Sequence, residues 1–336
     1  MKPDRRPLVT FALFAYNQEA YIREAVEGAF AQTYEPLEII LSDDCSSDRT
    51  YEIMREMAAA YDGPHEVRAV QTDRNIGVSS HVFLRGKEAK GQIVVVAAGD
   101  DISKPDRCAV HLGVYRDQNV MGVSGAFDLI DASGKLLSAD CKQPIASSAY
   151  ERQRGLFLKL DRPYVVIQGS TASYRRDVFE FGLPNWHLEF SEDNLFNFII
   201  YAHGFRVVHI DKSLVEYRQH DTALSNRASV IKSVSDREVS SFEAALKEIN
   251  KMDSFIWIAE NSDKTGCINL SEINSRKEVS LAIKQWPTLT FLQRTISIMQ
   301  SAKGLQFGAL KWKAARLFGN FPNYQPKSLI HNLLRG

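Results

Sequence analysis

Long apolar runs are absent from the 336-residue sequence. Its longest uninterrupted run is about six residues, whereas a helix needs ~18 to 20 to cross a bilayer. The N-terminal MKPDRRPLVTF also has no apolar segment typical of a signal peptide. We therefore expect a cytoplasmic protein.

The signature motifs of several enzyme classes are missing too. GxxxxGK[ST] is absent, and no GxGxxG follows the first expected strand, which argues against P-loop and dinucleotide-binding proteins. HExxH and GxSxG are lacking, which argues against the zinc proteases and serine hydrolases that carry these motifs. The cysteines Cys45, Cys108, Cys141 and Cys267 show no metal-binding or disulfide spacing.

Acidic residues are absent after Glu278, although the chain has a formal net charge of zero. The basic tail that remains carries aromatic residues, including Trp286, Phe307 and Trp312. Such a segment can lie on an anionic membrane surface, or it can pack as a helical subdomain on the rest of the chain. We favour peripheral attachment to the inner face of the membrane, and we expect no nucleic-acid partner.

Apolar strands alternate with amphipathic helices in the first part of the chain. The expected strands are VTFALFA (9–15), LEIILS (37–42), VRAVQT (67–72) and IVVVAA (93–98). Asn17 and either Ser46 or Ser47 are expected as helix N-caps. Strands that are apolar throughout and separated by helices predict an α/β fold, with an open, mostly parallel sheet and helices on both faces.

The remaining elements are less regular. In chain order we expect a hairpin around the ASGK turn, a helix over 147–160, a strand over 164–174, a helix begun by Ser191 and closed by Gly204, two strand segments after it, and helices beyond about 225. This predicts a catalytic domain of residues 1–225, with a nucleotide-binding half (1–118) and an acceptor half (119–225). Residues 226–336 form the helical C-terminal region with its basic tail.

Polar residues follow four of the expected strands, and ligands of open α/β sheets bind at the carboxyl ends of strands. Acids at several strand ends suit ribose, sugars or a hard cation. A Mg²⁺ or Mn²⁺ ion held by one or two carboxylates takes its remaining ligands from water and phosphate oxygens. A nucleoside diphosphate would supply such oxygens.

Five segments in order make the resemblance specific. They are FAYNQEAYIREAVEGAFAQTYEPLEIILSDDCSSDRT, DRNIGVS, AAGDDISKPDR, SEDNLF and YRQHDTALSN. Together they resemble the motifs of family-2 inverting glycosyltransferases, which have the GT-A fold. The resemblance covers roughly residues 8–226 and implies transfer of a sugar from a nucleoside-diphosphate donor.

The resemblance implies a set of residues that hold the donor nucleotide. They are Ala15, Tyr16, Glu19, Asp43, Arg74, Gly99 and Asp100. Asp44 is expected to brace its loop instead, and Gly99 would let the backbone approach the diphosphate closely.

The resemblance also implies a divalent metal, Mn²⁺ or Mg²⁺, at Asp100, Asp101 and His220. Ala98 stands where a common form of the motif has its first aspartate. Adjacent side chains on an extended segment point to opposite sides. We therefore expect Asp100 to be the metal ligand, and Asp101 to support it by bonding loop backbone or capping the turn at Ser103.

The acid pair Glu192 and Asp193 matches the position of the family's general base. An inverting displacement needs a carboxylate within hydrogen-bonding reach of the acceptor hydroxyl. Asp193 is the expected base and Glu192 a possible support, although acids at a helix N-terminus also stabilise the helix dipole.

Other residues are assigned to the acceptor side and to the leaving group. Gln168, Gly169, Ser170 and Trp186 would line the acceptor pocket, with ordinary turn and loop packing as the alternative. Arg218 would either supply positive charge to the leaving diphosphate or be a solvated strand residue.

The sequence thus predicts a metal-dependent inverting glycosyltransferase that uses a nucleoside diphosphate sugar, with UDP favoured. The acceptor would be a saccharide or a lipid-linked glycan in cell-surface polysaccharide synthesis. Two alternatives remain open, a nucleotidyltransferase and a non-catalytic protein that binds sugar nucleotides.

Overall fold

The computed structural model describes residues 6–141, 165–181, 192–221, 252–262, 268–271, 273–274, 277–278 and 281. The chain divides into two compact units, one of residues 1–229 with 257–269 and the other of 230–256 with 270–336. The elements that concern the site all belong to the first unit. The helix expected over 147–160, the side chain of Trp186 and the aromatic residues of the basic tail lie outside the described residues.

Strands from the described residues form one nine-stranded sheet. They are β1 (Val9–Ala15), β2 (Leu37–Asp43), β3 (Glu66–Gln71), β4 (Ile93–Ala98), β5 (Ile102–Ser103), β6 (Val120–Ile130), β7 (Leu136–Cys141), β8 (Ser173–Arg175) and β9 (Arg206–Arg218). The order is β3-β2-β1-β4-β8-β6-β9-β5, with β7 paired to β6. The first four strands in this order are parallel, β8 is antiparallel to both of its neighbours, and β6 and β9 are parallel.

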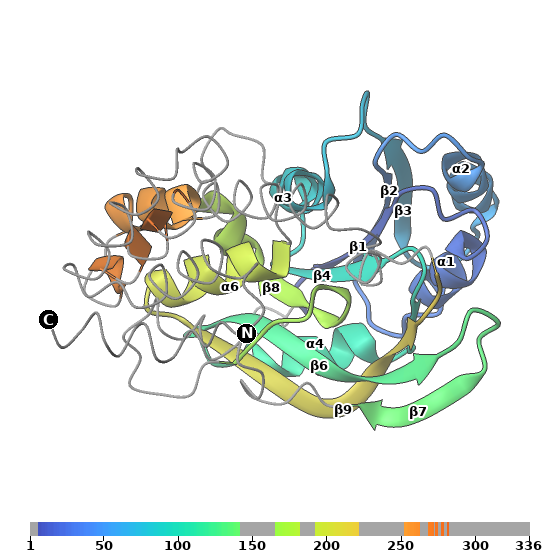
Figure 1. Cartoon of the computed structure of the whole chain (residues 1–336). Helices are drawn as coiled ribbons and strands as arrows, with labels where there is room; N and C mark the ends of the chain where they lie inside the picture. Colours follow the sequence, from blue (N-terminus) through green and yellow to red (C-terminus); the bar gives the residue numbers. More distant parts are fainter. Residues whose placement is uncertain are drawn as a thin grey trace, which may run out of the picture. The chain divides into compact units, whose positions relative to one another are not determined.

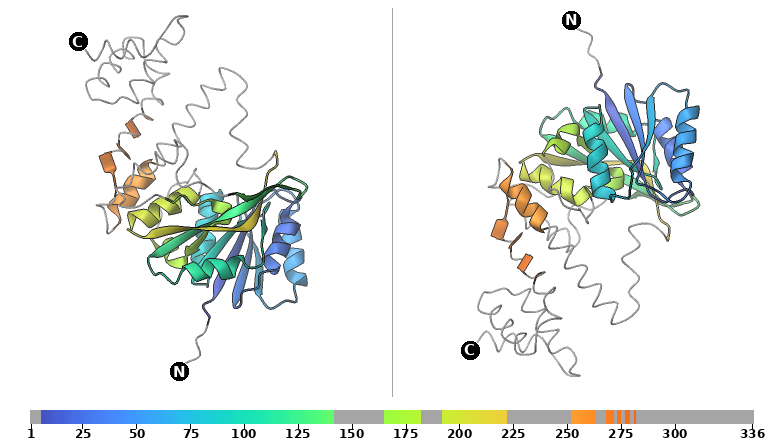
Figure 2. Two further views of the ribbon diagram at one scale, coloured as in Figure 1. Left: turned by 90° about the horizontal axis from the view of Figure 1, so that it is seen from below. Right: turned by 90° about the horizontal axis from the view of Figure 1, so that it is seen from above.

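Helices cover both faces of the sheet (Figure 1). They are α1 (Ile22–Phe30), α2 (Thr50–Ala60), α3 (Val78–Glu88), α4 (Arg107–Val114) and α6 (Glu192–Ala202), with short 3-10 turns η1 (Gly169–Thr171) and η2 (Arg176–Glu180). α1, α2 and α4 pack on one face, whereas α3 and α6 contact each other on the opposite face (Figures 1 and 2). The expected GT-A-type architecture, an open and mostly parallel α/β sheet, is confirmed.

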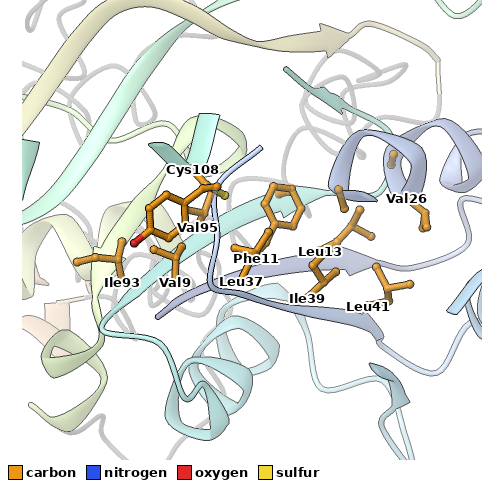
Figure 3. Packing of buried hydrophobic residues seen from close by; sticks show 14 of the residues in the cluster. Val9, Phe11, Leu13, Val26, Leu37, Ile39, Leu41, Ile93, Val95 and Cys108 are labelled. Carbon is orange, nitrogen blue, oxygen red and sulfur yellow. The ribbon is translucent and has the colours of Figure 1, made fainter. Parts of the chain in front are cut away.

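The main core is built from alternate residues of the central strands. Figure 3 shows β1 contributing Val9, Phe11 and Leu13 to one face of the sheet. Residues of β2 and β4 with the same parity join them, because successive side chains of a strand point to opposite faces. The intervening residues are buried as well, for example Ala12 and Val94. Burial on both faces is why these strands are apolar throughout, and it fixes where their polar ends lie.

Two expected helix caps and one expected strand are wrong. α1 begins after Tyr21 and α2 after Arg49, while Asn17 and Ser46 bond to each other's loops instead. The strand expected over 164–174 is interrupted by η1, so only Ser173–Arg175 joins the sheet. In both places contacts between distant segments outweigh the local sequence preference.

The described part of the second half otherwise follows the expected pattern. β6 and β7 form the hairpin around the 131–134 turn, and β9 is one long strand where the sequence suggested two segments. Residues 252–260 are helical. The domain boundary near residue 225 stays a prediction. No helix within the described ranges is long and apolar enough to cross a membrane.

Candidate functional site

The carboxyl ends of β1, β2, β3 and β4 lie at one edge of the sheet, because these strands are parallel neighbours. Backbone hydrogen bonds continue past the strand ends. The Asp44 amide donates to the Ala15 carbonyl at 2.9 Å, and the Gly99 amide donates to the Phe14 carbonyl at 2.8 Å. The polar residues that follow these strands therefore lie along one edge of the sheet.

The loop after β1 is fixed to the loop after β2. The Asn17 amide donates to Ser46 Oγ at 2.8 Å, and Asn17 Oδ1 accepts from the Ser47 amide at 2.8 Å. Glu19 Oε2 accepts from the Arg49 amide at 2.9 Å, so this carboxylate braces the two loops. Tyr16 is 44% exposed, while Ala15 beside it is buried. Tyr16 is thus one of the exposed side chains of this loop, together with Asn17 and Glu19.

Asp43 and Asp44, which end and follow β2, are both buried and both organise loops. Asp43 accepts hydrogen bonds from the Ser46 amide and hydroxyl and from Gln71 Nε2. Its carboxylate has no exposed surface, so a contact with a nucleoside requires Ser46 or Gln71 to turn aside and stays a prediction. Asp44 accepts from the amides of Ile76 and Gly77 at 2.9 Å, which is the bracing role expected for it.

Gly99 allows close packing of the β4 end against the loop after β1. A Cβ atom there would lie 2.6 Å from Gln18 Oε1 and 2.8 Å from the Ala15 Cβ. The need for glycine therefore arises within the protein, and an approach to a diphosphate stays a prediction. Arg74 is exposed in the loop between β3 and α3.

The structure pairs Asp100 with His220. Asp100 Oδ2 lies 3.1 Å from His220 Nε2, and the Asp100 side chain is 16% exposed. The Tyr21 ring packs on the imidazole with centroids 4.5 Å apart. Two of the three expected metal ligands are therefore neighbours at the end of β4.

Asp101 faces the protein interior. Its Oδ1 accepts from the Arg218 amide at 2.8 Å, and its Oδ2 has no hydrogen-bond partner among the described residues. Burial and the neighbouring Asp100 charge raise the pKa of Asp101 well above its usual value. The two aspartates do point to different surroundings, as expected, but Asp101 bonds to β9 and not to the turn at Ser103. Its role as a metal ligand stays a prediction.

Neither of the roles expected for Arg218 is correct, because its side chain is only 1% exposed and its nitrogens are occupied. Nε donates to the Asp100 carbonyl at 2.9 Å, and Nη2 donates to Glu24 Oε2 at 2.6 Å. Nη1 donates to the Ala132 carbonyl at 3.1 Å. Arg218 therefore fixes the backbone of Asp100 and is not available to a leaving group.

The donor set at the end of β4 fits a divalent cation that is shared with a phosphate ligand. Within the described ranges no group of three or more His, Cys, Asp or Glu side chains is placed to hold a metal. Asp100 and His220 supply one carboxylate and one imidazole. Mn²⁺ accepts both ligand types, and Mg²⁺ and Mn²⁺ both take further oxygen ligands from phosphate and water.

Gln168, Gly169 and Ser170, which are expected on the acceptor side, lie at the η1 turn. Gln168 Oε1 and Ser170 Oγ are buried and have no hydrogen-bond partner in the described part of the chain. Arg107 Nη2 donates to the Ser170 carbonyl at 2.9 Å. Ser170 is also near enough to Asp101 for its hydroxyl to favour the charged carboxylate, so the turn brings buried polar side chains next to the loop after β4.

Glu192 and Asp193 form the first turn of α6. Glu192 is buried against Gly169, where a Cβ atom would lie only 2.0 Å from Glu192 Oε1. Burial and the charge of Asp193 raise the pKa of Glu192 to about 8. Asp193 is half-buried, and its Oδ1 accepts from the Asn194 amide at 2.6 Å. The contact at Gly169 brings Glu192 to the η1 turn, and Asp193 follows it directly in α6.

Sequence reasoning missed Arg107 and Tyr21. Arg107 shares a helical stripe with Cys108 and His111, all of them buried. A charged residue on an apolar stripe was the available signal for a buried contact. Tyr21 carried no comparable signal, because its contacts are with Arg218 and His220, which lie far along the chain.

Comparisons with known proteins identify related glycosyltransferases. The family model described as Glycosyl transferase family 2 matches residues 10–183. An uncharacterized glycosyltransferase of Nostoc sp. is 24% identical over 70% of this chain and 71% of its own.

Solved structures are similar in fold. A mannosyltransferase from Pyrobaculum calidifontis in complex with GDP-Man and Mn²⁺ gives a TM-score of 0.53 at 17% identity, covering 98% of this chain and 80% of that one. S. aureus TarS in complex with UDP-GlcNAc gives 0.50 at 15% identity, covering 97% and 83%.

Proposed function

The chain belongs to glycosyl transferase family 2 and is a glycosyltransferase, and on this premise we propose that it moves a sugar from a nucleoside diphosphate sugar to an acceptor hydroxyl with inversion. UDP is the proposed nucleotide. The proposed acceptor is a saccharide or a lipid-linked glycan in cell-surface polysaccharide synthesis. Similar folds bind UDP-GlcNAc and GDP-Man, which supports a sugar-nucleotide donor.

One observation carries the proposal: acids from both halves of the fold approach the same set of loops. Asp100 and His220 lie at the end of β4, and Arg107 links β4 to the η1 turn. Glu192 packs on Gly169 of that turn. A donor diphosphate near Asp100 and an acceptor near Asp193 would then be bound on either side of the turn.

The proposed chemistry is a single in-line displacement. Asp193 accepts the proton of the acceptor hydroxyl, and the hydroxyl oxygen attacks the anomeric carbon of the donor. A new carbon–oxygen bond forms as the bond to the diphosphate breaks, so the nucleoside diphosphate leaves with the bonding electron pair. Gln168 and Ser170 would orient the acceptor through their buried oxygens.

Asp100 and His220 would hold a divalent cation, with Asp101 as a further candidate ligand. Bound there, Mn²⁺ or Mg²⁺ supplies positive charge that stabilises the departing diphosphate. Tyr16, Ala15, Glu19, Arg74, Gly99 and Asp43 are the proposed surroundings of the nucleotide.

The proposed location is the cytoplasmic side of a membrane, with the basic tail in contact with anionic lipids. Each Lys or Arg near such a surface contributes about 1 kcal/mol. Binding to vesicles with and without anionic lipid, compared for the full chain and a chain ending at residue 278, tests this.

A donor panel tests the proposed function. The protein is incubated with Mn²⁺ and UDP-, GDP- or dTDP-sugars, and thermal stabilisation and release of nucleoside diphosphate are measured. A ligand that binds only the folded state raises the melting temperature. We expect a UDP-sugar to stabilise most and to release UDP when an acceptor glycan is added.

The outcomes separate the alternatives. Release of pyrophosphate from a nucleoside triphosphate plus a sugar phosphate would indicate a nucleotidyltransferase. Tight donor binding without transfer or hydrolysis over a panel of acceptors would indicate a sugar-nucleotide-binding protein.

A further inference from the structure

Arg107 is the first residue of α4, and its side chain is completely buried. Nη1 donates to Ser103 Oγ at 2.9 Å, and Nη2 donates to the Val96 carbonyl at 2.6 Å. The same Nη2 donates to the carbonyls of Ser170 at 2.9 Å and Ala172 at 3.3 Å. One guanidinium thus joins β4, the segment before α4 and the η1 turn.

These contacts connect the strand that leads to Asp100 with the η1 turn. Val96 is four residues before Asp100 on the same strand and loop, and Ser170 belongs to the acceptor-side turn. Asp101 is close enough to Arg107 for each charge to favour the other. Burial lowers the pKa of Arg107 to about 10, so the guanidinium stays charged at neutral pH.

The η1 turn also contacts Glu192, the first member of the acid pair. At Gly169 the approach is close enough that any side chain there would overlap the Glu192 carboxylate. Asp193 follows Glu192 directly in α6. A shift of the turn would therefore move the surroundings of both carboxylates.

We propose that Arg107 is a positioning residue, which sets the η1 turn between the Asp100 loop and the Glu192–Asp193 pair and so places the acceptor hydroxyl for attack. This rests on the proposed function. Arg107 does not touch substrate. The planar guanidinium of Arg107 can donate to several carbonyls at once, whereas the donors of a lysine side chain are all on one nitrogen.

Arg107→Lys tests the proposal, with Arg175→Lys as the matched control. Arg175 also donates to backbone carbonyls, those of Val120, Tyr115 and Asp117, but it lies beside the start of β4, away from Asp100. We expect Arg107→Lys to lower kcat/KM for the acceptor roughly 10- to 100-fold, since small displacements of reacting groups have effects of this size. Donor affinity should be unchanged, and Arg175→Lys should leave both quantities unchanged.

A second readout does not depend on the reaction. The Thr171 and Ala172 amides donate to the carbonyls of Gln168 and Gly169 within the turn. Their hydrogen exchange should become about tenfold faster or more in Arg107→Lys, because the turn opens more often. If the wild-type enzyme transfers no sugar from any donor, the proposed function fails while this exchange result still tests the positioning of the turn.

Ser103→Ala is the milder variant if Arg107→Lys does not fold. It removes the acceptor of Nη1 and leaves the carbonyl contacts of Nη2 in place. We expect a smaller decrease in kcat/KM for the acceptor and a smaller increase in the hydrogen exchange of the turn amides. The proposal would be overturned if the folded variants had the same kcat/KM for the acceptor and the same hydrogen exchange in the turn as the wild type.

Discussion

His220 Nε2 lies 3.1 Å from Asp100 Oδ2, although 120 residues separate them in the chain. Asp100 follows β4, and His220 follows β9. Arg218, two residues before His220, donates from Nε to the Asp100 carbonyl and from its backbone amide to Asp101 Oδ1. The end of β9 therefore fixes the loop after β4 through backbone contacts and leaves the Asp100 carboxylate beside an imidazole.

Asp100→Asn should abolish most transfer activity without unfolding the protein. The side chain is partly exposed, and its removal leaves the bond between Arg218 and the Asp100 carbonyl intact. We expect a loss of about 100-fold or more in kcat/KM, and loss of the Mn²⁺-dependent part of thermal stabilisation by the donor. Asp106→Asn, which removes a surface partner of Lys212, is the control and should change neither. Normal transfer by Asp100→Asn would contradict the proposed metal contact.

Arg218→Lys should destabilise the protein and weaken donor binding together. The lysine keeps the positive charge beside the half-exposed Glu24, but its single ammonium cannot reproduce the bonds to both the Asp100 and Ala132 carbonyls. A buried polar group left without its hydrogen-bond partner costs about 1 to 3 kcal/mol in free energy of unfolding. Chemical denaturation and donor titration measure the two effects.

Glu24→Gln separates the ion pair from the carbonyl contacts. Glu24 is half exposed, so its neutral replacement should cost less than about 1 kcal/mol and leave donor binding unchanged. If Glu24→Gln and Arg218→Lys lowered the free energy of unfolding equally, the ion pair would account for the stabilisation. The bonds from Arg218 to the backbone carbonyls would then contribute little.

Residues whose role follows from local pattern were predictable from the sequence. The apolar runs of β1, β2 and β4 predicted buried parallel strands, and the alternation of side chains predicted different surroundings for Asp100 and Asp101. Asp44 was expected to brace its loop, and it does. The strand pattern and the alternation of side chains arise within a few residues, whereas the partners of Asp44 lie 32 and 33 residues away in the loop after β3.

Features that depend on distant partners were not predictable. The stretch before β8 has the β-branched composition of a strand, yet η1 forms where Arg107, more than 60 residues earlier, binds the Ser170 and Ala172 carbonyls. Asn17 and Ser46 have the side chains of helix caps but bond across two loops. Two alternative roles were expected for Arg218, because the sequence does not show that its guanidinium donates to Glu24.

Asp193→Asn should remove the general base while leaving the donor site intact. Loss of general base catalysis lowers rates by about 10²- to 10⁴-fold. We expect kcat to fall within this range, with no change in donor affinity measured by titration. Asp177→Asn, at the exposed start of η2, is the control for an acid in a first helical turn and should be silent. Near-normal transfer by Asp193→Asn would show that another group accepts the proton.

Glu192→Gln should stabilise the protein more as the pH rises. The folded-state pKa of Glu192 is raised from 4.5 to about 8, first by burial and then by the neighbouring Asp193. A raised carboxyl pKa means that folding favours the protonated form, so this stabilisation is complete below pH 4.5 and is lost as the pH approaches 8. Glutamine mimics the neutral form at every pH.

The advantage of Glu192→Gln over the wild type should therefore be small at pH 5 and reach the order of a few kcal/mol at pH 8 to 9. Denaturant unfolding at these pH values measures it, with exposed Glu180→Gln as the control. An advantage that does not grow with pH would mean that Glu192 is charged in the folded protein. The carboxylate would then contact a solvated or positively charged group, and its close packing on Gly169 would not persist in solution.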